Sequence, residues 1–389
     1  MEIMHGYKRT EVGIIPENWN VALLNDISSI TRLAGAEYSS VWKEDEFGEI
    51  IALRGFNIGN NQIIERDLVR ISNELSLKLK RSRLKKNDVV YPVVGTIGNA
   101  VVINEDNKYH IQQNIARITP KSQVEPVYLA YFLMSDLGYI EVMRFNATSS
   151  QPNVLVGSLR QYRIPLPPLP EQKAIAEVLS DTDNLIQTLE KQIAKKRLIK
   201  QGAMQKLLSP KEGWEEKKLG EFLQFEQPTK YLVSNTDYDD NYDIPVLTAG
   251  KSFVLGYSDD NHGIFKSVPV IIFDDFTTAS KYVTFPFKAK SSAMKILKPV
   301  SEDVNLRFIY ESMQQIKYPL GDHKRHWIGE FQHLAIKVPT IEEQRRIERI
   351  ISDMDAEIQF LAQKISKYHA LKKGLMQNLL TGKIRLNLK

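Results

Sequence analysis

Positively charged side chains are concentrated in a short stretch of the first half of the chain. The run from Lys78 to Lys86 contains Lys80, Arg81 and Arg83. Arg and Lys bind nucleic-acid phosphates, and together with Asn and Gln they also read base edges. The run therefore predicts a phosphate-contacting surface, with a solvated loop or helix face as the alternative.

Two further stretches of the first half carry side chains of the base-reading type. A turn, Gly95-Thr96-Ile97-Gly98, lacks the third glycine of a dinucleotide-binding fingerprint, so Thr96 is expected in a hairpin or a close backbone approach. The loop from 144 to 153 is polar and has no apolar anchor. Its candidate contacts are Arg144, Asn146, Ser149, Ser150, Gln151 and Asn153.

The second half offers one comparable cluster, in which a tryptophan follows charged side chains. The candidates there are His323, Lys324, Arg325 and His326, with Lys251 and Lys281 as isolated additions. A core or ordinary surface role is the alternative for Lys251 and Lys281. The His323-x-x-His326 spacing resembles half of a metal site, but the chain has no cysteine and offers no clear third ligand. We therefore predict no metal.

Motifs for catalysis are missing from the chain. Gly250-Lys251-Ser252 is not a phosphate-binding loop, because Pro245 stands where that motif needs a glycine. The Asn-Pro-Pro or Asp-Pro-Pro motif that adenine methyltransferases use at a flipped base is absent. We expect a non-catalytic protein, without a cofactor of its own, and rank a stand-alone nuclease or methyltransferase last.

Composition sets the broad class. The 389 residues are 42% hydrophobic and 25% charged, with a net charge of +5, which suits a globular protein of two or three domains and permits a nucleic-acid partner. The longest apolar run, near Val268 to Phe273, is too short to span a membrane, and the polar N-terminus is not a signal peptide. Without cysteines, a cytoplasmic protein is expected.

An internal repeat predicts the helices that must position these residues. Residues 171–211 reappear at 343–383, an offset of about 172, with roughly 18 of some 41 positions identical. Both copies carry apolar residues at alternating spacings of four and three, which predicts a coiled-coil helix of about 60 Å. The main seam residues are Ile175, Leu179, Ile186, Leu189 and Ile193, then Ile347, Ile351, Ile358, Leu361 and Ile365.

The two stripes are natural partners for each other, in an antiparallel pair. Lys200 and Lys372 interrupt the seams at equivalent positions, which indicates looser packing or register control. Two independent amphipathic helices, each packed on its own domain, are the alternative.

Short strand-like runs mixed with helical segments predict an α/β or α+β globule before each helix. Beyond their ends the two globules resist alignment. We expect a globule at 1–167, a spacer helix at 168–211, a second globule at 212–338 and a second spacer helix at 339–389.

This plan resembles the specificity subunit of type I restriction–modification enzymes. The resemblance rests on Pro165–Gln172 and Lys337–Gln344 before the helices and on Gly202–Leu208 and Gly374–Leu380 at their ends. The Gly95–Gly98 turn and Ser149–Asn153 add to it. The second globule departs from the pattern, because it has no copy of either and offers Asp322–Trp327 instead.

The resemblance implies two target-recognition domains, each reading one half of a bipartite double-stranded DNA sequence. It also implies two methyltransferase subunits on the helices, carrying S-adenosylmethionine, and restriction/translocase subunits that use ATP and Mg²⁺. A protein-interaction scaffold with incidental DNA binding is the alternative function.

Overall fold

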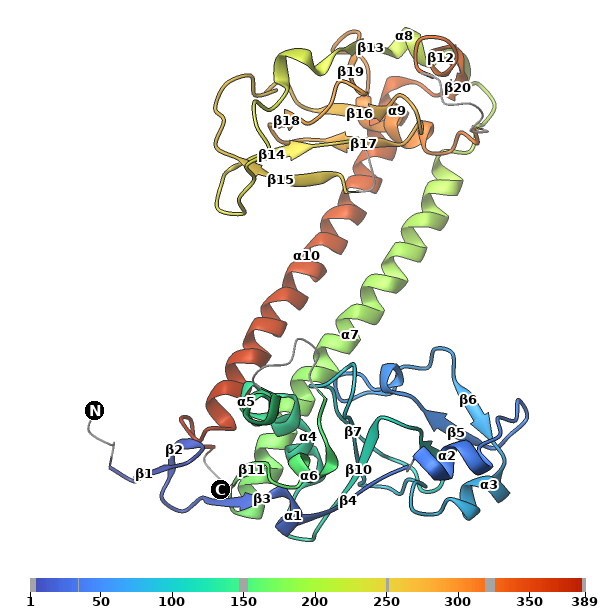
Figure 1. Cartoon of the computed structure of the whole chain (residues 1–389). Coiled ribbons are helices and arrows are strands. Elements are labelled where there is room, and N and C mark those ends of the chain that lie inside the picture. The colour runs from blue at the N-terminus through green and yellow to red at the C-terminus, as the bar shows by residue number, and fades with distance from the viewer. Residues whose placement is uncertain (1–4, 34, 147–152, 250–251, 319–325, 387–389) are drawn as a thin grey trace. The chain divides into compact units, whose positions relative to one another are not determined.

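The computed structural model describes residues 5–33, 35–146, 153–249, 252–318 and 326–386. The chain divides into two compact units, one formed by residues 1–191 with 363–389 and the other by residues 192–362. The unit boundaries cut both long helices, so each unit holds a segment of each helix and one globule. The two units are described one at a time below (Figure 1).

The first unit is built around two small sheets. One is antiparallel, with strand order β4-β10-β7-β8, and the other has the order β6-β5-β9, with β5 parallel to β9. Its elements before the first long helix are β1 (Tyr7–Thr10), β2 (Gly13–Pro16), β3 (Asn20–Leu23), α1 (Leu24–Ile27), β4 (Ser28–Arg32), α2 (Gly35–Val41), β5 (Ile50–Leu53), η1 (Gly55–Asn57), β6 (Val69–Ile71), α3 (Asn73–Lys78), β7 (Val89–Pro92), β8 (Val101–Val102), β9 (Tyr109–Ile111), β10 (Ile115–Pro120), α4 (Pro126–Met134), α5 (Asp136–Asn146), α6 (Val156–Leu159) and β11 (Arg163–Leu166).

The second unit repeats this topology with fewer helices. Its sheets have the orders β13-β19-β16-β17 and β15-β14-β18, with β14 parallel to β18, and β12 pairs with β20 as β3 pairs with β11. Its elements are β12 (Glu215–Lys218), α8 (Leu219–Phe222), β13 (Leu223–Glu226), η2 (Pro228–Tyr231), β14 (Ile244–Leu247), β15 (Val254–Ser258), β16 (Val270–Asp274), β17 (Ser280–Val283), β18 (Lys288–Ala289), β19 (Met294–Pro299), α9 (Leu306–Met313), η3 (Phe331–His333) and β20 (Ala335–Val338).

The two globules are therefore structural copies, although their sequences resist alignment. β7 and β16 occupy the same place in the two four-stranded sheets, each between two neighbouring strands. Val89, Val90 and Tyr91 in β7 and Val270 through Phe273 in β16 are all buried. A strand covered on both faces reads as a continuous apolar run rather than an alternating one, which explains both sequences.

The long helices are α7 (Leu169–Leu207) and α10 (Ile341–Leu379), each of 39 residues. Their entries are alike. Gln172 Nε2 donates to the Pro167 carbonyl at 2.8 Å, and Gln344 Nε2 donates to the Pro339 carbonyl at 2.9 Å. Eight of the ten main seam residues are buried; Ile358 and Ile365 are half-buried. The predicted seams are thus the packed faces of the helices.

Within each unit the two helix segments run antiparallel. In the second unit Lys196 pairs with Glu357 at 2.5 Å and Lys211 with Glu343 at 3.0 Å, so the partner's number falls as the first residue's number rises. In the first unit Lys372 pairs with Asp183 at 2.7 Å. The interruptions of the seams are therefore sites of register control, because a charged side chain there finds its counter-ion in only one register.

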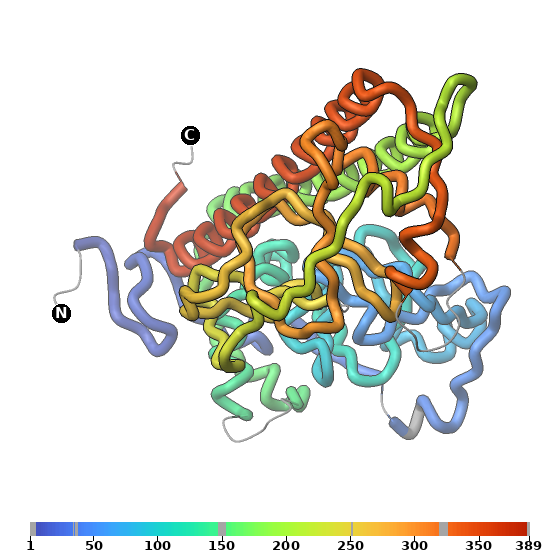
Figure 2. The backbone as a smooth tube through the Cα atoms, turned by 90° about the horizontal axis from the view of Figure 1, so that it is seen from above, coloured from blue at the N-terminus to red at the C-terminus, as the bar shows by residue number. Residues whose placement is uncertain are grey.

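The C-terminal stretch after α10 returns to the start of the first globule. Figure 2 shows it beside the N-terminal hairpin of β1 and β2, and Tyr7 Oη donates to the Gly382 carbonyl at 2.9 Å. Arg385 pairs with Glu171 at 2.6 Å, and Glu171 also accepts from Trp19 Nε1 at 3.0 Å. These contacts tie the N-terminal part of the first globule and the stretch after α10 to each other and to the start of α7.

Candidate nucleic-acid interface

The turn between β7 and β8 closes a hairpin and presents Thr96 to solvent. Gly95 and Gly98 have φ angles of +82° and +93°, a region that favours glycine. Thr96 Oγ1 donates to the Gly55 carbonyl at 2.8 Å, and Asn99 Nδ2 donates to the Ile58 carbonyl at 3.0 Å. The predicted turn is therefore held against the η1 turn, which follows β5.

A second loop is attached to the first residues of this turn. The Val154 amide donates to the Val93 carbonyl at 2.8 Å, and Asn153 forms a β-bridge with Val94. The Asn153 amide also donates to Asn146 Oδ1 at 3.1 Å, which closes the loop on the end of α5. The structure thus brings Thr96, Asn146 and Asn153 together. Ser149, Ser150 and Gln151 lie outside the described residues.

Two residues that the sequence analysis did not single out stand beside Thr96. The Arg54 guanidinium lies 4.6 Å from the centre of the Phe56 ring, and 36% of Phe56 is exposed. Both flank Gly55, whose carbonyl receives Thr96. The available signal was the apolar run Ile50–Leu53, which predicts a strand and so puts Arg54 and Phe56 in the turn that follows it.

The predicted basic run makes contacts elsewhere in the first globule. Lys80 and Arg81 are exposed, and the Arg81 carbonyl accepts from Thr31 on β4 and from Arg117 on β10, both at 3.2 Å. Arg83 donates to Asn73 Oδ1 at 2.9 Å. The run therefore lies against β4, β10 and α3, whereas Thr96 lies against η1.

Arg144 is held by its own globule. It pairs with Glu141 at 3.1 Å, donates to the Gln161 carbonyl, and stacks on Phe145 at 4.6 Å. Glu141 is buried and also pairs with Arg163 at 3.1 Å. These contacts fix the end of α5, from which the 144–153 loop leaves.

The second globule builds the equivalent turn between β16 and β17 from different residues. Asp274 Oδ1 accepts from the amides of Phe276 at 2.9 Å and Thr277 at 3.2 Å, an arrangement that stabilises a tight turn. Phe276 is 39% exposed, and Thr278 has a φ angle of +57°. The turn presents an aromatic ring where the first globule presents Thr96.

Asp275 anchors this turn to the loop that carries the predicted basic cluster. Its carboxylate accepts from the Trp327 amide at 2.9 Å and pairs with Lys295 at 3.2 Å, and its carbonyl accepts from the His326 amide at 2.9 Å. Asp275 and Lys295 side chains are each only 2% exposed. A buried ion pair leaves its members little freedom, so the turn is held rigidly.

Corresponding loops therefore meet in both globules. In each globule, the turn that follows β7 or β16 is hydrogen-bonded to the segment that leads toward the final strand, β11 or β20. In the first globule Val93 holds Val154, and in the second Asp275 holds His326 and Trp327. Different side chains on one scaffold can present different hydrogen-bonding groups to a ligand.

Comparison with known proteins identifies the scaffold. The family model described as the type I restriction modification DNA specificity domain matches residues 16–196 and 211–367. The chain belongs to this family of type I restriction–modification specificity subunits. Specificity subunits of this type are non-catalytic and recognise DNA, and they work in a complex with other subunits of the system.

Relatives and solved structures agree with this family. The chain is 51% identical to the EcoR124I/EcoR124II specificity subunit of Escherichia coli over 126 residues, or 31% of each chain. It is 26% identical to a putative MjaX specificity subunit of Methanocaldococcus jannaschii over 98% of this chain and 97% of that one. The solved S subunit from M. genitalium covers 96% of this chain with a TM-score of 0.61 at 16% identity, a likeness of fold. That match covers 97% of the solved chain.

The predicted contacts of the second globule fall in three places. His326 is 1% exposed, and its Nδ1 lies 3.3 Å from Tyr318 Oη, so it supports the loop from inside the specificity subunit. Lys281 is exposed on β17 next to the Asp274–Ala279 turn. His323, Lys324 and Arg325, like Lys251, lie outside the described residues.

Among the described residues of the specificity subunit, no group of three His, Asp or Glu side chains could hold a metal ion. Within those same parts of the chain, no helix is both long and apolar enough to cross a bilayer.

Proposed function

We propose that each globule reads one half of a bipartite double-stranded DNA target. The observation that carries this proposal is the loop assembly at equivalent places in both globules, built from unlike residues. Thr96 and Asn153 meet in one assembly, and Phe276 and Thr277 form the turn of the other. Base edges are distinguished by the side chains that meet them, so unlike loops on one scaffold recognise unlike half-sites.

The division of labour follows the repeat. Residues 1–167 and 212–338 act as target-recognition domains, and residues 168–211 and 339–389 act as helical spacers that set the distance between half-sites. A DNA-reading protein of this kind is expected to work in the cytoplasm, without a membrane partner. The ion pairs of Lys372 and Lys200 with the other helix keep the spacer in a single register.

The helices also carry a stripe that suits a partner protein. On α7 it consists of eight exposed residues whose spacing alternates between four and three, as in the seam. Ile199 and Leu371 occupy equivalent places in the repeat, and each is 50% exposed. On α7 this stripe comprises Asp181, Leu185, Thr188, Gln192, Lys195, Ile199, Gly202 and Lys206.

Several stripe residues are identical in both copies, and all of them are exposed except the half-buried Gly374. They are Asp181 and Asp353, Lys195 and Lys367, and Gly202 and Gly374. Ile199 lies one turn after Lys195 and about one turn before Gly202. The exposed apolar side chain forms a ridge and the glycine leaves a groove, and a partner helix can pack against both. Two copies of one surface bind two copies of one partner, which in this system is the methyltransferase subunit.

The remaining chemistry is assigned to partner subunits. The methyltransferase subunits bind S-adenosylmethionine and flip the target base, and restriction/translocase subunits bring ATP and Mg²⁺. This chain contributes target choice and geometry.

Methylome sequencing of cells that carry the system tests the reading mechanism. Four residues inserted between Leu185 and Lys195 add one helical turn, about 6 Å, which corresponds to roughly two base pairs. The half-sites should stay the same while the spacer between them lengthens. Altered half-sites or an unchanged spacer would show that the helices do not set the distance between the half-sites.

Stoichiometry tests the docking stripe. Ile199→Asp or Leu371→Asp should each reduce the bound methyltransferase subunits from two to one, measured by light scattering of the purified complex. Leu198→Asp is the matched control, because Leu198 is 68% exposed and lies beside the stripe. Equal loss for the control, or full assembly of both stripe variants, rules out this surface.

A further inference from the structure

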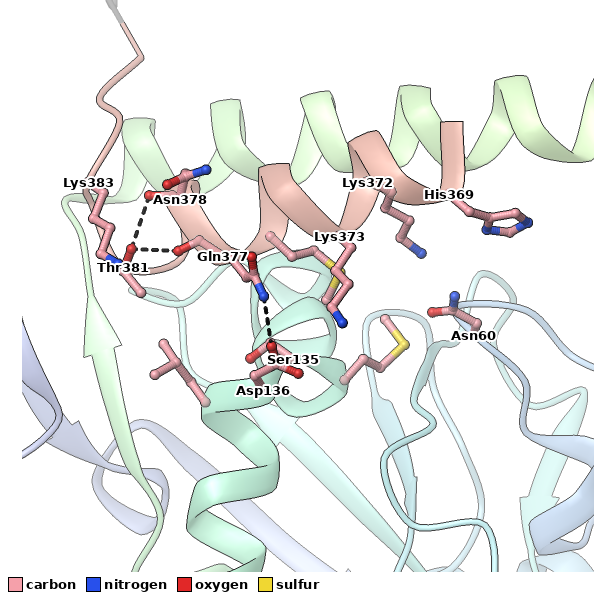
Figure 3. A pocket seen from close by; sticks show the side chains of 13 residues that line it. Asn60, Ser135, Asp136, His369, Lys372, Lys373, Gln377, Asn378, Thr381 and Lys383 are labelled. Carbon is pink, nitrogen blue, oxygen red and sulfur yellow. Dashed lines mark hydrogen bonds between the residues drawn. The ribbon is translucent and has the colours of Figure 1, made fainter. Parts of the chain in front are cut away.

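A cavity of about 610 Å³ in the first unit lies between the last turns of α10 and the junction of α4 with α5. Figure 3 shows Lys372, Lys373 and His369 on the side of this cavity where Asn60 lies. The lining mixes polar and apolar side chains, and it comes from three segments far apart in the chain. It therefore exists only in the folded first unit.

This side of the cavity carries one lysine without an ion-pair partner among the described residues, Lys373. Lys372 is neutralised by Asp183 at 2.7 Å. Lys373 and His369 are exposed, and among the described residues no carboxylate forms an ion pair with Lys373. An anion entering beside Lys373 would meet an unpaired cation.

The first turn of α5 forms part of the cavity wall. The helix has 11 residues, and Ser135 Oγ accepts from the Gly138 amide at 3.3 Å, which marks the start of the helix at the cavity wall. Helix N-termini favour anions. Asp136, the carboxylate in this wall, is engaged by Gln377 Nε2 at 3.1 Å (Figure 3).

The wall formed by Asn60 is connected to the segment that follows the Gly95–Gly98 turn. Asn60 forms a β-bridge with Ala100, and the Asn61 amide donates to the Ala100 carbonyl at 2.9 Å. Ala100 follows the Gly95–Gly98 turn that presents Thr96. A duplex resting on Thr96 therefore has backbone phosphates close to the cavity, since each strand carries one charge per ~3.4 Å.

We propose that this cavity binds a backbone phosphate of DNA beside the first half-site, through Lys373 with His369 and Asn60. This inference rests on the proposed reading of DNA by the first globule and adds a contact that is independent of sequence. Such contacts fix the position of a protein on the duplex without selecting bases.

The repeat argues against a protein partner as the occupant. A site for one of two identical subunits should recur in both copies, as the docking stripe does. At the positions of Lys373 and His369, the first copy has Gln201 and Arg197. Lys373 and His369 therefore occur in only one copy of the repeat. This is expected for a contact that belongs to one globule, and not for one that two identical partner subunits share.

Salt-dependent DNA binding by the assembled methyltransferase complex tests the proposal. Lys373→Gln should weaken binding to specific and non-specific DNA by a similar factor of about three to ten at low salt. The slope of log affinity against log salt should fall by about 0.9, the value for one phosphate contact. Lys191→Gln is the matched control, because Lys191 is an exposed lysine of α7 in the same unit that lies outside both the cavity lining and the docking stripe.

Neutral methylphosphonate linkages, placed one at a time near the first half-site, identify the source of the anion. One linkage should weaken binding by the parent complex and have no further effect on Lys373→Gln. Unchanged affinity and slope for Lys373→Gln overturn the proposal. So does weakened assembly with methyltransferase subunits in the absence of DNA, which would indicate an acidic protein segment instead. Loss of the proposed function is separate, since the parent complex would then lack sequence-selective binding.

Discussion

Lys372 Nζ lies 2.7 Å from Asp183 Oδ1, and the repeat places Lys200 and Asp355 in the same relationship in the other unit. Each seam lysine thus meets an aspartate of the opposite helix. The Lys372 side chain is 6% exposed and that of Asp183 13%, so neither charge is well solvated. The two pairs make the antiparallel register of the helices a property of charge as well as of apolar packing.

Removing one member of this pair should destabilise the first unit. Asp183→Asn leaves Lys372 with a weakened partner, and loss of a buried pair member costs on the order of 3 kcal/mol. The melting temperature by circular dichroism should fall by several degrees. The double variant Asp183→Asn with Lys372→Met should recover most of the loss, and failure to recover would show that the pair is not the cause.

Phe56 should contribute to reading the first half-site. Phe56→Ala should lower affinity for the specific sequence about tenfold, since one good base contact contributes ~1–3 kcal/mol. Non-specific binding should change little. Phe47→Ala provides a control, because Phe47 is 90% exposed. Equal affinities of the parent and Phe56→Ala complexes in fluorescence anisotropy would exclude the contact.

Asp275 should be needed for the second half-site and not for the first. Asp275→Asn leaves Lys295 buried without a full counter-charge, at a cost on the order of 3 kcal/mol, and loosens the turn. Methylome mapping should then show relaxed bases in one half-site only. Adding Lys295→Met should restore stability, and a variant relaxed in both half-sites would contradict independent reading.

His110 should make the first globule less stable in mild acid. Burial lowers the pKa of His110 from its ordinary value, the largest effect, while the nearby Ile111 and Leu79 carbonyls act in the opposite direction. Because the folded pKa is depressed, the unfolded state binds the proton more readily. The stabilising contribution is complete above about pH 6.5 and is lost as pH falls through the folded pKa.

The His110 effect is measured by urea denaturation between pH 7.5 and 5. The parent should lose stability over this range, and His110→Gln should lose less. The comparison uses slopes against pH, so a constant destabilisation of the variant does not matter. Parallel curves would assign the acid sensitivity to other groups.

The heptads, the helix starts and the duplicated plan were all predictable from the sequence, because each depends on local spacing. Ile175 and Leu179 belong to a stripe with a 3.5-residue repeat. Pro167 and Gln172 at the first helix entry recur as Pro339 and Gln344 at the second. The family resemblance followed from the same segments. These features depend on residues that are close together in the sequence, so the sequence alone is enough to predict them.

Tertiary structure alone decided which loops meet and which side chains face solvent. Thr96 meets Gly55 across 41 residues, and Asp275 meets Trp327 across 52. Such pairings arise from strand order and buried charge, which leave no periodic trace in the sequence. For the same reason, His326 looked like part of a basic surface cluster but lies in the interior, where burial against Tyr318 makes it a support for the loop.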